Sequence, residues 1–281
     1  VIYADSRGAI WIGTDGGGLD RYDPSTQSFT HYKHDPKNSN SLGADTVLDI
    51  AEDQNGYLWL GTWAGGLNRL DPNTGDILRI TRDSHAAPEK MLREDNIYRV
   101  VVHDDGRILI AVGYSGLQIY DPKTQTFVTH TANESLQNTL HTRIINDIER
   151  ADEHHYWVAG HKGIEKFNIT TGEWSHPPVA IFEAIWDIYR TNDGWLWLAT
   201  GGGLIRFNPA NNEVIRYTTD DGLPENYILG IEQDALGDLW LATRKGIARF
   251  SPNTKRVETF NQADGLASMQ HSRLAHELTR D

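Results

Sequence analysis

Acidic residues recur at one position of a pattern that the chain repeats. Each precedes an apolar residue, as in Asp49-Ile50 and Asp147-Ile148. If the copies surround a common axis, these carboxylates could bind a cation such as Ca²⁺, which prefers several oxygen ligands. We favour the interpretation that these carboxylates line a solvated channel or pair with basic side chains. We therefore expect no metal site and no cofactor, and keep four residues as weak metal candidates: Asp49, Asp147, Asp187 and Glu277.

A second set of residues combines aromatic rings with positive charge. They follow the second strand of a repeat or open its first strand, at positions that vary among copies. Ring faces stack on apolar ligand surface, and a guanidinium binds a carboxylate through two hydrogen bonds. The set suits an anionic sugar or another carboxylated ligand, although packing against a neighbouring domain is the alternative. The candidate ligand-binding residues are Trp63, Tyr98, Tyr114, Arg143, His161, Lys162, Trp186, Tyr227, Arg244 and Lys245.

The repeated pattern itself is long and specific. Residues 59–75 read WLGTWAGGLNRLDPNTG, and residues 11–27 read WIGTDGGGLDRYDPSTQ. Further copies follow at intervals of about 40 to 50 residues, and repeats of that length are typical of solenoids and propellers. The anchor positions of the six copies are Trp11, Trp59, Leu109, Trp157, Trp197 and Trp240.

Each copy predicts four short β-strands. The first strand is an apolar run such as VLDIAED, and an Asn-Gly or Asp-Gly turn joins it to a second strand such as YLWLGT. A glycine-rich turn leads to the third strand. An Asp-Pro turn then leads to a short fourth strand. Repeated radially, such sheets bury both faces. We predict an all-β fold, a β-propeller of four-stranded antiparallel blades. Six repeats are complete, and the first strand of a seventh lies within residues 272–281, so the propeller is six-bladed or a truncated seven-bladed one. Residues 1–281 form a single propeller domain.

Residues that recur in nearly every copy are expected to serve the blade. A basic residue in the third strand predicts ion pairing between blades or stacking, and an Asp or Asn after that strand predicts a turn cap. The basic residues are Arg21, Arg69, Lys166, Arg206 and Arg249, and the turn residues are Asp23, Asp71, Asp121, Asn168 and Asn208.

Composition narrows the classes of function. The chain has 281 residues with a net charge of −13, which disfavours nucleic-acid binding because that binding depends on basic residues. No apolar run approaches the ~20 residues that a transmembrane helix needs, so no membrane contact is expected within this chain. The chain has no cysteine, which excludes disulfides and thiolate chemistry. A serine-nucleophile elbow is also missing from the sequence, so we predict no enzyme. A propeller lyase or hydrolase with a central metal site is the catalytic alternative.

The pattern D-x-x-G-x-[LI]-W-[LI]-G-T-x-x-G-G-L-x-R-[FLY]-D-P resembles the two-component regulator propeller repeat, found in sensor regions of hybrid histidine kinases and related bacterial receptors. Residues 53–72 match it, and residues 218–243 resemble the family's linker and first strands. The third and fourth copies depart from it, with Leu109 for Trp and His154 for the turn Gly.

The resemblance implies a fragment of a larger multi-domain sensor, in the periplasmic or extracytoplasmic part of a membrane-anchored receptor used in signal transduction. It implies a small-molecule or oligosaccharide ligand, carbohydrate sensing, and adjacent receptor domains as partners. A homodimer is a further possibility, and a purely structural module for receptor dimerisation is the remaining alternative.

Overall fold

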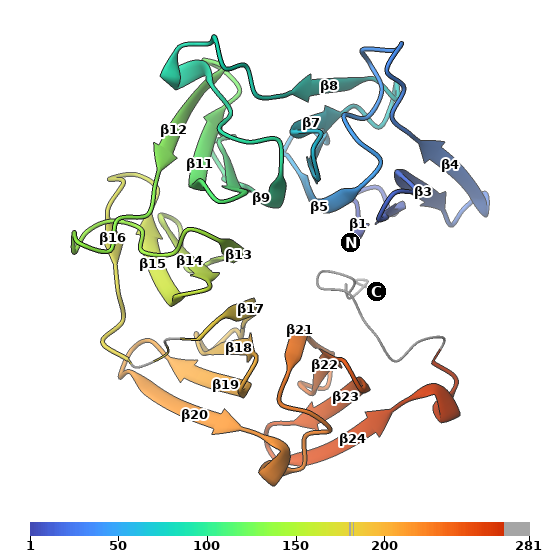
Figure 1. Cartoon of the computed structure of the whole chain (residues 1–281). Helices are drawn as coiled ribbons and strands as arrows, with labels where there is room; N and C mark the ends of the chain where they lie inside the picture. The colour runs from blue at the N-terminus through green and yellow to red at the C-terminus, as the bar shows by residue number, and fades with distance from the viewer. Residues whose placement is uncertain (180, 182, 267–281) are drawn as a thin grey trace. The chain divides into compact units, whose positions relative to one another are not determined.

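The computed structural model describes residues 1–179, 181 and 183–266. These residues form six four-stranded sheets, and in each sheet the strands lie in sequence order (Figure 1). The fold is the predicted all-β propeller, with six blades. The predicted strand of a seventh blade, within residues 272–281, lies outside the described residues.

The blades fall into two compact units, each described here by itself. The first contains residues 1–132 and 143–145. Blade 1 consists of β1 (Ile2–Ala4), β2 (Ile10–Gly13), β3 (Leu19–Asp23) and β4 (Ser28–Tyr32). Blade 2 consists of β5 (Val47–Glu52), β6 (Leu58–Thr62), β7 (Leu67–Leu70) and β8 (Ile77–Ile80). Blade 3 consists of β9 (Ile97–Val102), β10 (Ile108–Val112), β11 (Gly116–Asp121) and β12 (Thr126–His130).

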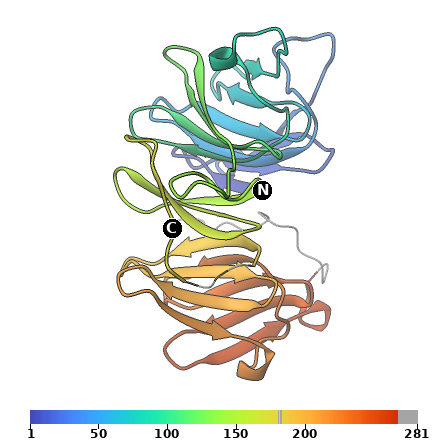
Figure 2. The same ribbon diagram turned by 60° about the vertical axis from the view of Figure 1, so that its left-hand side comes forward.

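The second unit contains residues 133–142 and the described residues from 146 onward. Figure 2 shows its sheets from a second direction, in yellow to red. Blade 4 consists of β13 (Ile145–Arg150), β14 (His155–Gly160), β15 (Gly163–Asn168) and β16 (Trp174–Ser175). Blade 5 consists of β17 (Ile185–Arg190), β18 (Leu196–Thr200), β19 (Gly203–Asn208) and β20 (Glu213–Tyr217). Blade 6 consists of β21 (Ile228–Gln233), β22 (Leu239–Thr243), β23 (Gly246–Ser251) and β24 (Arg256–Phe260).

Helical structure in the described part of the chain is limited to three 3₁₀ turns, η1 (Pro88–Lys90), η2 (Thr219–Asp221) and η3 (Gln262–Asp264). None of these turns has the length or the apolar character that crossing a membrane requires.

In blades 1, 2 and 6 the first hairpin is fixed by an aspartate and a tryptophan six residues apart. In blade 2, Oδ1 of Asp53 accepts the N–H groups of Asn55 and Tyr57, and its Oδ2 accepts the indole N–H of Trp59 at 2.9 Å. Gly56 has a φ of +78°, which a residue with a side chain rarely adopts. The predicted Asn-Gly hairpin turn is confirmed. The same indole contact to aspartate occurs in blades 1 and 6.

The core of each unit lies between successive blades. In the first unit, Trp11 of blade 1 packs with Leu58 and Leu60 of blade 2 and is fully buried. In the second unit, Trp197 of blade 5 packs with Leu239 and Leu241 of blade 6. A buried tryptophan can remove ~150–250 Å² from water, so these anchors are a main source of stability between sheets.

Candidate ligand-binding site

A bulge in the first strand aims two of the predicted aromatic side chains. In β9, Ile97 and Arg99 pair with consecutive residues of β10, so Tyr98 is the extra residue. In β17, Ile185 and Asp187 pair with consecutive residues of β18, so Trp186 is the extra residue. A bulge breaks the inward–outward alternation of a strand, and bulges often re-aim side chains at functional sites. Both rings are only half-buried.

In the second unit, four predicted residues form a continuous row, which we call the aromatic row: His161, Trp186, Tyr227 and Arg244. The His161 ring meets Trp186 edge-on, with centroids 5.7 Å apart. Trp186 and Tyr227 are tilted at 32° with centroids 5.6 Å apart. The Arg244 guanidinium carbon lies 3.8 Å from the Tyr227 ring centroid. These residues come from three successive blades, so the row depends on the packing of the blades.

Positive charge at one end of the row is open to a ligand. Arg244 is exposed, and no carboxylate among the described residues pairs with it. Its face is covered by Tyr227, which leaves the N–H edge of the guanidinium for an acceptor. Lys245, the next residue, is also exposed. The chain has a net charge of −13, yet Arg244 stacks on an aromatic ring and does not pair with an acid. This arrangement favours an anionic or hydroxyl-rich ligand.

The first unit contains a smaller aromatic pair. Trp63, which follows β6, has its ring 5.8 Å from that of Tyr98 and is 48% exposed. Tyr114 is 61% exposed, and its N–H donates to Oε1 of Glu94 at 3.0 Å. Arg143 is exposed before β13. The sequence analysis grouped these residues with the aromatic row as one candidate site, and that grouping stays a prediction; the two sets belong to different units.

Lys162 lies apart from the aromatic row, although it is adjacent to His161 in sequence. It pairs with Glu134 at 3.5 Å and lines a cavity together with His141, Glu165 and His176. The sequence analysis missed that cavity. A visible signal was the Pro177-Pro178 pair at the end of the fourth strand, which interrupts the repeat only in blade 4.

The first-strand aspartates join successive blades. Oδ2 of Asp49 accepts the N–H of Val100 at 2.6 Å, and in the second unit Oδ2 of Asp147 accepts the N–H of Ile188 at 2.7 Å. Asp187 repeats this contact with Ile231. All three aspartates are buried, so they do not line a solvated channel.

Burial raises the pKa of Asp49, while Arg99 and two backbone N–H groups oppose that rise. The carboxylates are held by backbone donors, and no cluster of metal-binding side chains occurs among the residues that the structure describes. Glu277, the fourth weak candidate, lies outside them.

The recurring basic residue stacks on the anchor tryptophan of its own blade. Arg21 lies opposite Trp11 in the strand register, with its guanidinium carbon 5.8 Å from the ring centroid. The same contact recurs in blades 2, 4, 5 and 6. In blade 3 the two positions hold Leu109 and Ile119, so an apolar pair replaces the cation–π pair. The predicted stacking is confirmed, and it acts within a blade instead of between blades.

The predicted turn caps are also confirmed. The side chains of these Asp and Asn residues accept the N–H two residues later, at 2.8–2.9 Å in all five turns: Asp23, Asp71, Asp121, Asn168 and Asn208.

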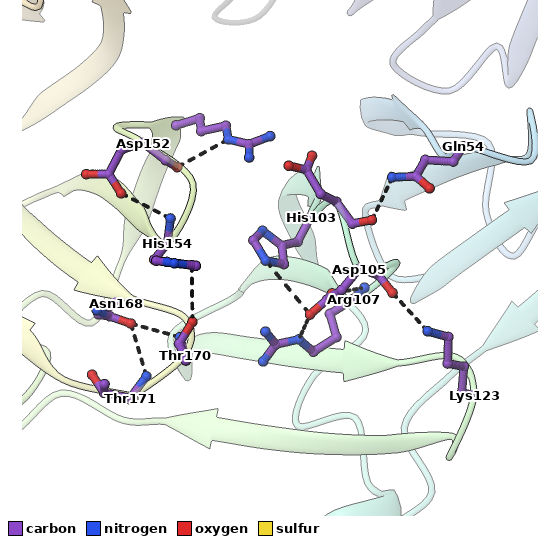
Figure 3. Close-up of polar contacts among 12 residues, drawn as sticks. Gln54, His103, Asp105, Arg107, Lys123, Asp152, His154, Asn168, Thr170 and Thr171 are labelled. Atoms are coloured by element: carbon purple, nitrogen blue, oxygen red, sulfur yellow. Dashed lines mark hydrogen bonds and ion pairs between the residues drawn. The ribbon is translucent and has the colours of Figure 1, made fainter.

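Blade 3 departs from the repeat at its first hairpin (Figure 3). His103 replaces the hairpin aspartate, and its Nε2 lies 3.8 Å from Asp105 Oδ2. Arg107 donates to the same carboxylate at 2.8 Å. Gln54 of the blade 2 hairpin donates to the carbonyl of Asp104 at 2.6 Å. Polar side chains here replace the aspartate–tryptophan bond of blades 1, 2 and 6.

Blade 4 departs in a different way, because its hairpin lacks the turn glycine. Oδ1 of Asp152 accepts the N–H groups of His154 and His155 at 3.0 Å (Figure 3). It also accepts Nδ1 of His155 at 2.7 Å. Partial burial works against ionisation, but these hydrogen bonds and the nearby positive charges lower the pKa of Asp152 to about 2. An ionised aspartate therefore closes this turn.

Comparison with known proteins agrees with the repeat pattern. Residues 41–64 and 222–245 match the two component regulator propeller family. These two segments are similar to repeats of that family. The two matched segments run from the linker through the first two strands of blades 2 and 6. Trp63 follows the second strand of the first segment, and Tyr227 and Arg244 belong to the second. No curated protein sequence matches the chain.

Solved structures share the fold of these propeller repeats. One is the extracellular domain of a B. thetaiotaomicron protein described as a hybrid two component system, with a TM-score of 0.77 and 19% identity over 97% of this chain and 36% of that one. PorZ, a surface component of the type-IX secretion system of Porphyromonas gingivalis, has a TM-score of 0.69 and 17% identity over 89% of this chain and 38% of its own. A streptogramin B lyase has a TM-score of 0.68 and 15% identity, covering 92% of this chain and 81% of the lyase. At these identities the likeness shows the fold alone. The chain spans well under half the length of the first two proteins.

Proposed function

We propose that this chain is a non-catalytic, ligand-binding propeller in the extracytoplasmic sensor region of a bacterial signalling receptor. The regulator propeller repeats and the fold shared with extracellular receptor domains support this proposal. The single observation that carries the binding role is the aromatic row in the second unit.

A carbohydrate is the proposed ligand class. The apolar faces of sugar rings stack on aromatic side chains, and Trp186 and Tyr227 offer two such faces side by side. Arg244 supplies N–H donors at one end, which suit a sugar hydroxyl or carboxylate. No nucleophile or metal is needed for this role, so the ligand leaves unchanged.

Signalling requires that the ligand favour one arrangement of the receptor. A ligand shifts an equilibrium only by binding one state more tightly than another. The aromatic row is built from three successive blades, so a ligand across it stabilises their packing. Adjacent receptor domains that contact these blades would sense that change.

A thermal-shift panel of neutral and acidic oligosaccharides tests the proposal. The expected result is a saturable rise in Tm with one ligand class, lost in Trp186→Ala and kept in Phe29→Ala. Phe29 is a suitable control because it is a 53% exposed aromatic residue on β4 of blade 1. Chromatography of the hit after incubation should return the intact oligosaccharide. A flat panel, or cleavage of the ligand, would overturn the proposal.

A further inference from the structure

The fourth strand of blade 4 ends early. β16 pairs with β15 only through Lys166–Ser175 and Phe167–Trp174, whereas β20 of blade 5 pairs with β19 over five positions. Pro177 and Pro178 follow, and proline lacks the N–H that a strand pairing needs. Among the described residues, β16 therefore pairs with the second half of β15 and no strand pairs in register with its first half.

In blade 4 the chain reaches the position of a fourth-strand end only at Ile181. In blade 5 a Cβ at Gly203 would collide with the carbonyl of Tyr217, the last residue of the fourth strand. In blade 4 a Cβ at Gly163 would collide in the same way with the carbonyl of Ile181. In blade 5, Tyr217 lies two residues after Ile215, which pairs with Arg206 of β19. In blade 4, Ile181 lies six residues after Ser175, which pairs with Lys166 of β15. Blade 4 thus contains four extra residues at this point.

Pro177, Val179 and Ile181 of this segment line an open cavity of about 470 Å³, within the size range of small-molecule sites. We call it the blade-4 pocket. Ile164, Trp174 and Ile181 form its buried apolar wall. The polar side chains that line it come from the 133–142 linker, from β15 and the turn before it, and from β16 and the residue after it: Gln137, Asn138, His141, Lys162, Glu165, Ser175 and His176.

The single carboxylate that lines the pocket is already occupied. Glu165 is buried, and its oxygens accept the N–H groups of His141 and Thr142 at 2.9 Å. Its Oε2 also contacts Nε2 of His176 at 3.1 Å. A carboxylate with three donors offers little to a ligand cation. It also holds the His176 ring in place, stacked on that of His141 with centroids 3.9 Å apart.

The groups left for a ligand are two acceptors and one cation. In His141 and His176 the Nε2–H donates to an oxygen, so Nδ1 of each neutral ring is an acceptor, and neither Nδ1 has a protein partner within the described part of the chain. Lys162 contributes an ammonium group that is 57% exposed, and its pairing with Glu134 at 3.5 Å is on the surface, where such pairs are weak. A cation and two acceptors beside an apolar wall match a small molecule with a carboxylate, hydroxyl groups that donate hydrogen bonds, and an apolar face.

We propose that the blade-4 pocket binds a small carboxylate of monosaccharide size, such as a hexuronate. This site is separate from the aromatic row, since it uses Lys162, His141 and His176 in place of Trp186, Tyr227 and Arg244. The proposal therefore does not depend on the function proposed above.

Calorimetric titration of the chain with D-glucuronate, acetate and D-glucose tests this site. We expect saturable binding of glucuronate, weaker binding of acetate and none of glucose. Lys162→Ala should raise Kd about tenfold or more, because it removes a charge-assisted contact to the carboxylate. His176→Ala should raise Kd about three- to tenfold, because it removes a neutral acceptor for a ligand hydroxyl. Lys162 is exposed, so its substitution leaves the fold intact even if His176→Ala is unstable.

Two control variants make the test specific. His31→Ala removes the matching cross-strand contact of blade 1, His31 Nδ1 to Asp20 Oδ1 at 2.6 Å, and should leave Kd unchanged. Trp186→Ala should also leave it unchanged. Equal binding of glucose, no binding of glucuronate, or loss of binding in Trp186→Ala would each overturn the proposal, and the last result would place the carboxylate in the aromatic row.

Discussion

The backbone N–H of Ile188 donates to Oδ2 of Asp147 at 2.7 Å, and the two residues lie on the first strands of successive blades. Oδ1 of the same aspartate accepts the N–H of Ile148 at 2.7 Å. One buried carboxylate thus accepts backbone N–H groups from the first strands of two successive blades. Replacing it leaves a buried donor without its acceptor.

Asp147→Ala should lower the free energy of unfolding by about 1–3 kcal/mol, the cost of unsatisfied buried hydrogen-bonding groups. Urea denaturation measures this loss. Asp76→Ala is the matched control, because Asp76 is exposed, and its effect should stay within about 0.5 kcal/mol. Equal effects of the two substitutions would show that Asp147 does not hold the blades together.

Calcium should leave the Tm unchanged at neutral pH, and so should EDTA. The carboxylates of Asp49, Asp147 and Asp187 are engaged by backbone N–H groups of the next first strand. An ion that binds the folded state would raise Tm. A calcium-dependent rise that disappears in Asp49→Asn would restore these residues as metal ligands.

Arg206→Met should lower the free energy of unfolding by about 0.5–2 kcal/mol, as expected for a partly desolvated cation–π contact. The Arg206 guanidinium carbon lies 4.0 Å from the Trp195 ring centroid and 5.4 Å from that of Trp197. Methionine keeps the apolar stem and removes the charge. Urea denaturation measures the loss, with Arg190→Met on an exposed position of β17 as control. If both variants unfold alike, the recurring arginine has no stacking role.

Acid should weaken the blade 4 hairpin through Asp152. The pKa of this group is about 2 in the folded chain and near 3.8 without the fold, so the folded state favours the carboxylate. Its contribution is present above pH 4 and is lost as pH falls from about 4 to 2. Asp152→Asn should therefore flatten the decline of Tm between pH 4 and pH 2. Parallel curves for variant and wild type would contradict this prediction.

The fold could be predicted from the sequence because the same residues build each blade. Asp53, Gly56 and Trp59 recur at fixed spacing, and each has a local role that the pattern itself expresses. The first-strand acids were harder to interpret. Whether Asp147 meets an ion, water or a backbone N–H depends on the neighbouring blade, which no local pattern describes.

The candidate site was predicted in part. The turn and first-strand positions yielded His161, Trp186, Tyr227 and Arg244, which the structure brings together in one row. The bulge at Trp186 could not be predicted, because the register of β17 depends on its pairing with β18. The blade-4 pocket was missed because an insertion creates it, and its size depends on how the chain returns to β15.

The most direct test of the account is calorimetric titration of the best oligosaccharide from the panel into wild type, Trp186→Ala and Phe29→Ala. Losing an aromatic stacking face should raise Kd about tenfold or more in Trp186→Ala, while Phe29→Ala keeps the wild-type value. Unfolding curves of the two variants confirm that each is folded. The same Kd for wild type and Trp186→Ala would contradict the assignment of ligand binding to the aromatic row.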